Sequence, residues 1–253
     1  MQVRQACRVP EELLRGGFVT EVVRVGDTVR RRPGRNSVFA HRVLDLLEQA
    51  GWAGAPRFLG LDEQGREVLS FLDGYVAWQP RQLAEVGTDG SIAAAAELLR
   101  QFHDLTAGTA VAGGCEVVCH NDLSPRNTVY RDDGAGLRPV AFIDWDLAAP
   151  GSRIHDLAHM CWQYVGLGPQ LEAAGQAARQ VRLVCDAYRL ANRNAVVDTI
   201  LWWQDRCWRG IQAGAAAGDP AMTRLHGTGA TESVRQQHRW VARHRAELGA
   251  VLR

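Results

Sequence analysis

Two short polar segments decide the fold of this chain: HNDLSPRN at residues 120–127 and FIDWD at residues 142–146. Each follows a short apolar run, VVC before the first and PVA before the second, which is typical of a β-strand. The first segment gathers a histidine, an aspartate and two asparagines, and the second carries two aspartates. This pattern indicates a polar site assembled at the ends of short strands.

The chain after Asn127 is predicted to fold back as a β-hairpin with its turn centred between Gly134 and Leu137. In that register opposed residue numbers add up to about 271, so Asn127 faces Asp144 across the hairpin. A carboxamide oxygen and a carboxylate oxygen then meet, as Mg²⁺ prefers when water and phosphate fill its other positions. Asp122 lies just before the hairpin, close enough to accept a proton from a substrate hydroxyl.

The residue types also allow a plainer interpretation. Aspartate and asparagine near turns most often stabilise the turn itself, and Asn127 could simply end a loop. For His120 we expect a structural role, in which the ring hydrogen-bonds the loop and holds Asp144 in place.

The composition is that of an ordinary globular protein. The 253 residues include 46% hydrophobic and 23% charged residues, enough for one large domain or two small lobes. A net charge of +1 gives no reason to expect a nucleic-acid or membrane-surface partner. No apolar run reaches the roughly 20 residues of a membrane span. The first residues contain no apolar signal-peptide core, so we expect a cytoplasmic location.

Residues 1–72 are predicted to form a small lobe built on a β-sheet. β-Branched residues on both sides of Gly26 indicate one hairpin, and a second is expected around Gly65. Apolar residues at helical spacing predict a helix over residues 37–51.

Residues 73–253 are predicted to form a larger, mainly helical lobe. Its first long helix is expected over residues 91–107, with Ser91 as the N-cap. The short strands around the two polar segments follow, and helices dominate from Gly168 onward. The predicted fold class is therefore α+β and bilobal.

At this point the two polar segments resemble the signature segments of the aminoglycoside phosphotransferase family, which is similar to choline kinase and to the protein kinases. HDLAHMCW at residues 155–162 resembles the family's Asp-Leu-Ala helix start, and LLRQFHDL at 98–105 resembles its helix ending in Leu-His. The resemblance implies a protein-kinase-like fold. Residues 1–72 would bind nucleotide, and residues 73–253 would carry catalysis and substrate binding.

The resemblance also implies an activity, the ATP-dependent transfer of a phosphoryl group to a hydroxyl of a small molecule. The acceptor would be an antibiotic such as an aminoglycoside, an amino-alcohol or a sugar, and GTP is the alternative donor. Asp122 would be the catalytic aspartate, and Asn127 and Asp144 would bind Mg²⁺. Adenine would hydrogen-bond the backbone of Ser70 and Leu72.

Two further features follow from the resemblance and from its limits. Asp156 would be structural, capping a helix and bracing the loop of His120. The chain contains no lysine, because all 29 basic residues are arginine. The strand lysine with which the family holds phosphates must therefore be replaced, and Arg31 in TVRRRP is predicted to take its place, with Arg30 as the second choice.

The helix glutamate that pairs with this lysine in the family is also missing, since Ala40 and His41 stand at the expected turn. The nucleotide lobe has therefore lost or rebuilt its ion pair. This loss favours an alternative function, a pseudokinase that binds nucleotide without transfer, whereas the intact Asp122, Asn127 and Asp144 favour an enzyme. The absence of D-F-G and A-P-E motifs disfavours a protein kinase.

The acceptor site is predicted on the helix that contains LWWQDRCW, residues 201–208. Asp205 and Trp208 lie within helical reach of each other and could contact a cationic or ring-bearing substrate. Ordinary helix packing by tryptophan and a solvated aspartate are the alternative.

Overall fold

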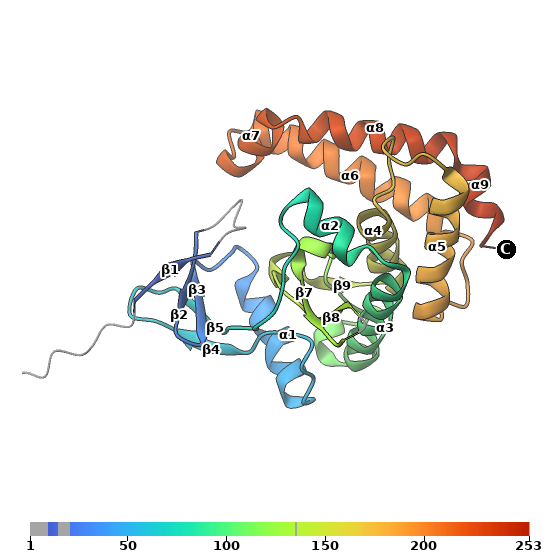
Figure 1. Ribbon diagram of the computed structural model, residues 1–253. Helices are drawn as coiled ribbons and strands as arrows, with labels where there is room; N and C mark the ends of the chain where they lie inside the picture. The colour runs from blue at the N-terminus through green and yellow to red at the C-terminus, as the bar shows by residue number, and fades with distance from the viewer. Residues whose placement is uncertain (1–9, 15–20, 135, 253) are drawn as a thin grey trace, which may run out of the picture.

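The computed structural model describes residues 10–14, 21–134 and 136–252. A five-stranded antiparallel sheet forms one lobe, at the left in Figure 1, and a mainly helical lobe lies to its right. This is the bilobal α+β fold that the sequence predicts.

The sheet of the small lobe has the strand order β1-β2-β3-β5-β4. Its strands are β1 (Glu12–Leu13), β2 (Val22–Val25), β3 (Thr28–Arg31), β4 (Phe58–Leu61) and β5 (Glu67–Ser70). Gly26 has φ 61 in the turn between β2 and β3, and Gly65 has φ 71 between β4 and β5. Both turns need the left-handed backbone that glycine adopts without strain, so the two predicted hairpins are confirmed.

Helix α1 (Ser37–Gln49) connects β3 to β4 and ends just before Gly51, as predicted. Its buried residues recur every three or four positions. The helix contacts β4 of the sheet and α3 (Asp89–Thr106) of the helical lobe. α1 therefore helps to fix the small lobe against the large one (Figure 1).

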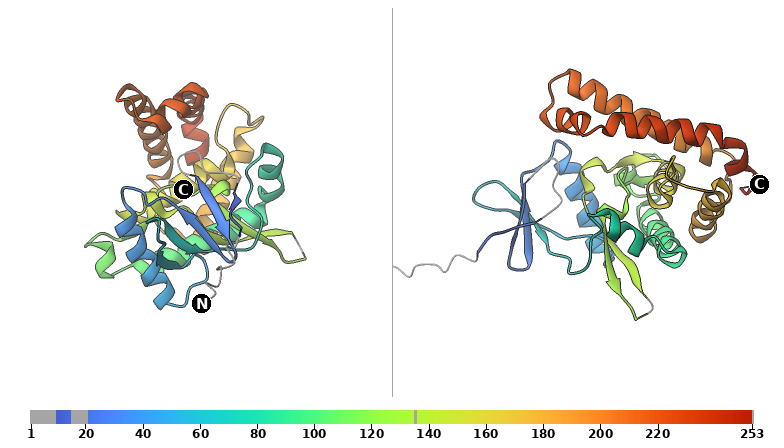
Figure 2. Two further views of the ribbon diagram at one scale, coloured as in Figure 1. Left: turned by 90° about the vertical axis from the view of Figure 1, so that its left-hand side faces the viewer. Right: turned by 45° about the horizontal axis from the view of Figure 1, so that its top comes forward.

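The helical lobe begins after the sheet and continues to the end of the chain. Besides α3, its helices are α2 (Pro80–Val86), α4 (Arg153–Val165), α5 (Ala174–Tyr188), α6 (Val196–Ala216), α7 (Pro220–Gly227), α8 (Ala230–Arg243) and α9 (Arg245–Ala250). Helices α6 and α8 lie side by side along one side of this lobe (Figures 1 and 2). Among the described residues, none of the helices is both long and apolar enough to span a bilayer.

The start of α3 differs from the prediction. The N-cap is Thr88, whose Oγ1 accepts a hydrogen bond from the Ser91 N–H over 3.2 Å. Asp89 and Gly90 are already helical, so Ser91 occupies the third helical position and is buried. Threonine and serine are both good N-caps, and the first of them along the chain begins the helix here.

Short strands carry the two polar segments. They are β6 (Val117–Cys119), β7 (Thr128–Asp132), β8 (Leu137–Phe142) and β9 (Ala149–Gly151), in the pairs β6–β9 and β7–β8. The β7–β8 hairpin pairs Thr128 with Phe142, and its register shifts after Val129. Asn127 therefore opposes Ile143, to which it is joined by a 2.9 Å backbone hydrogen bond. The predicted pairing of Asn127 with residue 144 is wrong by one position. The hairpin turns earlier than predicted, with Asp132 opposite Leu137, and the irregularity after Val129 offsets only part of this difference.

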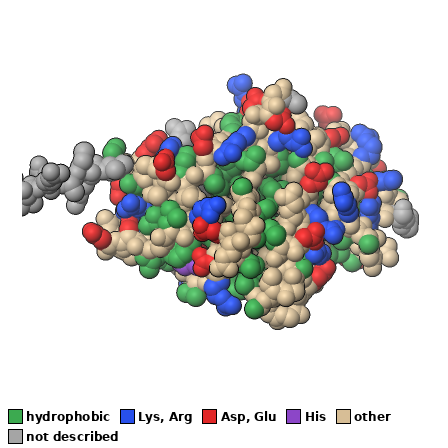
Figure 3. Space-filling model, turned by 90° about the horizontal axis from the view of Figure 1, so that it is seen from below, with side chains coloured by type: hydrophobic (Ala, Val, Ile, Leu, Met, Phe, Trp, Pro, Cys, Tyr) green, Lys and Arg blue, Asp and Glu red, His purple; other side chains and the backbone are tan. Residues whose placement is uncertain are grey.

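One cluster of buried side chains connects the two lobes. It includes Ala40 and Leu44 of α1, Phe102 of α3 and Trp145 after β8, and it continues through α4 and α5. Acidic and basic side chains are interspersed on the face shown in Figure 3. The buried cluster that joins the lobes gives the boundary between them a rigid, close-packed support on the side of the helical lobe.

Candidate active site

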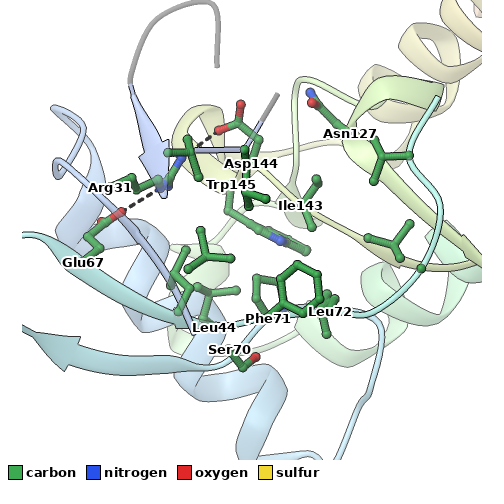
Figure 4. A pocket seen from close by; sticks show the side chains of 18 of the residues that line it. Arg31, Leu44, Glu67, Ser70, Phe71, Leu72, Asn127, Ile143, Asp144 and Trp145 are labelled. Carbon is green, nitrogen blue, oxygen red and sulfur yellow. Dashed lines mark hydrogen bonds and ion pairs between the residues drawn. The ribbon is translucent and has the colours of Figure 1, made fainter. Parts of the chain in front are cut away.

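A pocket of about 400 Å³ opens between the sheet and the helical lobe. It is lined by β2, β3, β5, α1, the chain after β5, and the ends of the β7–β8 hairpin (Figure 4). Five of the predicted site residues line it together: Arg31, Ser70, Leu72, Asn127 and Asp144. The hairpin therefore delivers Asn127 and Asp144 to one cavity although they are not directly opposed.

Asp122 is joined to this pocket through Asn127. The carboxamide nitrogen Nδ2 of Asn127 donates to Asp122 Oδ2 over 2.8 Å and to the Asp122 carbonyl over 2.9 Å. Because the nitrogen is used in this way, the amide oxygen is the Asn127 atom left to face a ligand. Asn127 ends the short 3₁₀ turn η2 (Pro125–Asn127), which fixes its backbone next to β7.

The environment of Asp122 makes it a candidate proton acceptor. Burial and the nearby charge of Asp144 raise the pKa of its carboxyl, against the lowering effect of the Asn127 hydrogen bond, to about 7. A carboxyl with a pKa near neutrality can exchange a proton at physiological pH. It is thus suited to general-base chemistry, which an ordinary exposed aspartate performs less well.

Asp144 stands at a backbone position that few side chains adopt. Its φ is 65, in the left-handed region, immediately after Ile143 and before the turn η3 (Trp145–Leu147). A residue other than glycine in this region is strained by roughly 1–2 kcal/mol. The turn leaves the Asp144 side chain 45% exposed and 3.1 Å from Arg31. The strained residue is therefore the acid that can reach a bound ligand.

His120 connects the two acidic loops. Its ring is fully buried, with Nε2 3.1 Å from the Ile143 carbonyl and Nδ1 3.3 Å from the Asp122 N–H. These partners require a proton on Nε2 and none on Nδ1, and burial lowers the pKa, which favours the neutral ring. The structure thus places His120 between the backbones of Asp122 and Ile143, just before Asp144.

Asp156 of α4 supports the same loop by hydrogen bonds to its backbone. Its fully buried carboxylate accepts hydrogen bonds from the His120 N–H over 2.6 Å and the Asn121 N–H over 2.8 Å. Burial alone would raise its pKa, but hydrogen bonding from His103, 3.1 Å away, and these backbone donors lower it overall. Since the N-cap of α4 is Ser152, the expected capping role of Asp156 is wrong, and only the bracing contact is present.

A second group of possible metal ligands surrounds Asp156. His103, Cys119 and Asp156 are all buried, with ligand atoms within 4.8 Å of one another. His103 Nδ1 also lies 2.7 Å from the Tyr188 hydroxyl, and Cys119 Sγ donates to the Ser152 carbonyl over 3.3 Å. These contacts explain the group as a hydrogen-bonded support for the loop.

Arg31 at the end of β3 is the basic residue of the pocket. Its Nε donates to Glu67 over 2.9 Å and NH1 to Asp144 over 3.1 Å, while both terminal nitrogens contact Asp146. Arg30, the second candidate, does not line the pocket and pairs instead with an acid of the β4–β5 turn. One guanidinium therefore faces three carboxylates, two of them on the loop after β8.

Glu67 is a functional residue that the sequence interpretation missed. The helix carboxylate expected near Ala40 and His41 is absent from α1, but Glu67 on β5 supplies a carboxylate to Arg31. His41 Nε2 lies 2.6 Å from the other Glu67 oxygen. The expected ion pair of the small lobe is therefore formed with a residue of a neighbouring strand. The only signal in the sequence is a glutamate at the head of an apolar strand.

The chain after β5 forms the wall opposite the hairpin. Ser70 and Leu72 line the pocket, as predicted, on either side of Phe71 (Figure 4). The Ser70 backbone N–H and hydroxyl are both bonded to the backbone of Arg57. The Phe71 ring is covered by the guanidinium of Arg24 at 3.7 Å. An apolar slot with backbone groups at its edge suits a flat heterocyclic base.

Asp205 and Trp208 of α6 do not line this pocket. Asp205 accepts hydrogen bonds from Arg209 at both carboxylate oxygens over 2.8 Å. The Trp208 ring is flanked by Arg209 at 4.5 Å and Arg235 at 5.0 Å. Both predicted substrate residues are therefore engaged with arginine side chains of α6 and α8.

Helix α6 nevertheless approaches the catalytic loop. Burial raises the pKa of the Cys207 thiol to about 11, and the charge of Asp122 contributes to this shift. Cys207 of α6 therefore lies within electrostatic range of Asp122.

Comparisons with known proteins agree with this geometry. The family model described as the phosphotransferase enzyme family matches residues 109–191, which contain both signature segments. The trifolitoxin immunity protein of Rhizobium leguminosarum bv. trifolii is 31% identical over 275 residues, which cover 96% of this chain and 98% of that protein.

Solved structures share the fold. A choline/ethanolamine kinase family protein from Mesorhizobium loti superposes with a TM-score of 0.54 and 20% identity, covering 92% of each chain. The GDP complex of aminoglycoside 2'-phosphotransferase-IIIa gives a TM-score of 0.63 and 13% identity, covering 90% of this chain and 92% of the other. Fold and pocket thus define a protein-kinase-like phosphotransferase. The chain belongs to the phosphotransferase enzyme family, whose members include small-molecule kinases.

Proposed function

We propose that this protein transfers the γ-phosphoryl group of ATP to a hydroxyl group of a small molecule. The observation that carries this proposal is the 2.8 Å hydrogen bond between Asn127 Nδ2 and Asp122 Oδ2 at a pocket that Asp144 also lines. It joins a candidate proton acceptor to one candidate metal ligand, and the second candidate ligand, Asp144, lines the same pocket, which has an apolar slot of a size to hold a nucleobase. Phosphoryl transfer needs this kind of positioning and little covalent work by the protein.

The residues present fit a magnesium–nucleotide complex. Asn127 turns its nitrogen to Asp122 and keeps its oxygen for a ligand, and the Asp144 carboxylate is 45% exposed. These two hard oxygen donors would hold Mg²⁺, which supplies charge neutralisation for the phosphates when it is bound. The nucleobase of the nucleotide would occupy the apolar slot beside Ser70 and Leu72.

The side chains of this protein would divide the work as follows. Asp122 orients the acceptor hydroxyl and accepts its proton, which its pKa of about 7 allows at neutral pH. Asn127 holds the Asp122 carboxylate in one orientation through its amide nitrogen. Arg31 carries the fixed positive charge of the pocket and would contact phosphate oxygens.

For the acceptor we propose a hydroxyl-bearing toxin or antibiotic, and for the biological role protection of the cell by its phosphorylation. The support is the name of the 31% identical relative, an immunity protein against trifolitoxin. The charged surface of α6–α8 favours an acceptor that is not strongly cationic. Its carboxylates at Asp205 and Glu232 are paired with Arg209 and Arg239, so they offer little free negative charge to a polycation.

The alternative of nucleotide binding without transfer rests on the missing strand lysine and helix glutamate. The pairing of Arg31 with Glu67 removes that reason, because the phosphate-facing cation has a buried carboxylate partner after all.

The test is a transfer assay with magnesium, labelled ATP and a panel of toxins, aminoglycosides, amino-alcohols and sugars. We expect labelled product with at least one acceptor, and none with Asp122→Ala, which should still bind ATP. Binding of ATP by the wild type without transfer to any acceptor or water would instead support the non-catalytic alternative.

A further inference from the structure

Glu67 is the most deeply buried carboxylate that lines the pocket, with a side chain only 1% exposed. Both of its oxygens are engaged. Oε2 accepts from Arg31 Nε over 2.9 Å, and Oε1 lies 2.6 Å from His41 Nε2, which must be the donor to an ionised carboxylate. Burying a charge in this way costs several kcal/mol unless partners compensate, so the arrangement is a built site and not a chance surface contact.

The sheet itself fixes the pair. Arg31 and Glu67 are directly opposed in the antiparallel β3–β5 ladder. Opposed residues project to the same face of a sheet with Cβ atoms about 5 Å apart. Helix α1 covers this face and brings His41 to the far side of the Glu67 carboxylate. Three elements of the small lobe thus converge on one carboxylate.

The acidic partners of Arg31 contact two different edges of its guanidinium group. The inner atom, Nε, is held by Glu67, whereas the terminal nitrogens contact Asp144, which lines the pocket (Figure 4), and Asp146 of the following turn. The phosphates would lie at this end of the pocket. A free arginine side chain has about 2 kcal/mol of rotamer entropy to lose. A partner at Nε removes much of that freedom in advance and aims the terminal nitrogens.

We propose that Glu67 is a positioning residue, braced by His41, that orients Arg31 toward the phosphates of the nucleotide. The inference rests on the proposed function, because it takes a nucleotide as the ligand of the pocket. It assigns to a strand residue the role for which the sequence offered no helix residue.

The test measures the affinities of the full-length protein for MgATP and for adenosine by calorimetry. Glu67→Gln keeps the size of the side chain and removes its charge. We expect MgATP affinity to fall about tenfold, the worth of one charge-assisted hydrogen bond, while adenosine affinity is unchanged. A merely structural role would instead weaken both ligands, or neither, and either result would overturn the proposal.

A double-mutant cycle asks whether Glu67 acts through Arg31. In an Arg31→Ala background, Glu67→Gln should change MgATP affinity by less than about twofold, because the group it positions is gone. Fully additive losses would overturn the proposal. The matched control is Asp62→Asn, which removes another acid that contacts β3, through Arg30, outside the pocket. An equal loss of MgATP affinity in this control would show a general effect on the sheet and would also count against the role of Glu67.

Should Glu67→Gln fail to fold, Glu67→Asp replaces it, because this variant keeps the charge and withdraws the carboxylate from Nε by one methylene. The same selective loss of MgATP affinity is expected, and wild-type affinity would refute the positioning role. Wild-type protein that binds MgATP no better than adenosine would point to a different failure, that of the phosphate site and of the proposed function itself.

Discussion

Asn127 and Asp122 are locked together, since one amide nitrogen lies 2.8 Å from the Asp122 carboxylate and 2.9 Å from its carbonyl oxygen. The contact sets the rotamer of the candidate base and, in the same step, turns the Asn127 oxygen toward the pocket. A candidate base and a candidate metal ligand are thus positioned by a single pair of hydrogen bonds. We therefore expect the protonation state of Asp122 to control the activity of this site.

The rate of transfer should rise with pH through about 7. Burial and the charge of Asp144 raise the pKa of Asp122 to about 7, and only the ionised carboxylate can accept the proton of the acceptor hydroxyl. The measurement is kcat/KM for the acceptor between pH 5 and 9, at saturating MgATP. A flat profile across neutrality would mean that another group accepts the proton.

The same burial predicts a stability effect of Asp122→Asn. The folded pKa lies above the ordinary value of 3.8, so the native protein binds more protons than the unfolded chain between pH 3.8 and about 7. The free energy of unfolding of the wild type therefore falls as pH rises through this window. Above the window the buried charge of Asp122 destabilises the native state by a constant amount. Without added magnesium, Asp122→Asn should raise Tm at pH 8 by roughly 5 °C and leave it unchanged near pH 3.5. Equal melting temperatures at pH 8 would contradict the burial argument.

Asp156 should show the opposite dependence. Its folded pKa is lowered by His103 and by the backbone donors of the loop, so its contribution is present above pH 3.8 and is lost as pH falls through the folded pKa. Breaking a buried pair costs about 3–5 kcal/mol, so Asp156→Asn should unfold at much lower urea concentration at pH 7. The matched control is Asp186→Asn, whose partners are the exposed Arg182 and the partly exposed Arg193 and whose loss should cost at most about 1 kcal/mol.

The fold could be predicted where the signal is local. The turns at Gly26 and Gly65 and the apolar spacing of α1 depend on neighbouring residues, and all three predictions are confirmed. Helix α2 was not predicted, because its seven residues are too few for a helical period to stand out. The N-cap of α3 is Thr88 and not the predicted Ser91, because two residues that can both cap a helix lie three positions apart.

The site could be predicted only where its residues share one short stretch of chain. The sequence assigns Asn127 and Asp144 to a common cleft because a single hairpin connects them, although the hairpin turns earlier than predicted and their pairing is off by one residue. Arg31 and Glu67 meet across strands 36 residues apart. Their contact depends on which strands are neighbours in the sheet, and neither periodicity nor spacing records that order.

Replacing Arg31 should impair the use of ATP, whereas replacing its neighbour Arg30 should not. Arg31 presents its terminal nitrogens to the pocket, and Arg30 pairs with Asp62 outside it. Arg31→Ala should raise KM for ATP or lower kcat by about tenfold or more, because a phosphate contact is lost and two facing carboxylates are left unpaired. Arg31→Lys should recover part of the loss, since it restores the charge without the two-edged geometry. The measurement is initial rates over a range of ATP concentrations for the three variants. If Arg30→Ala proved as damaging as Arg31→Ala, the assignment of the phosphate-facing cation would have to be abandoned.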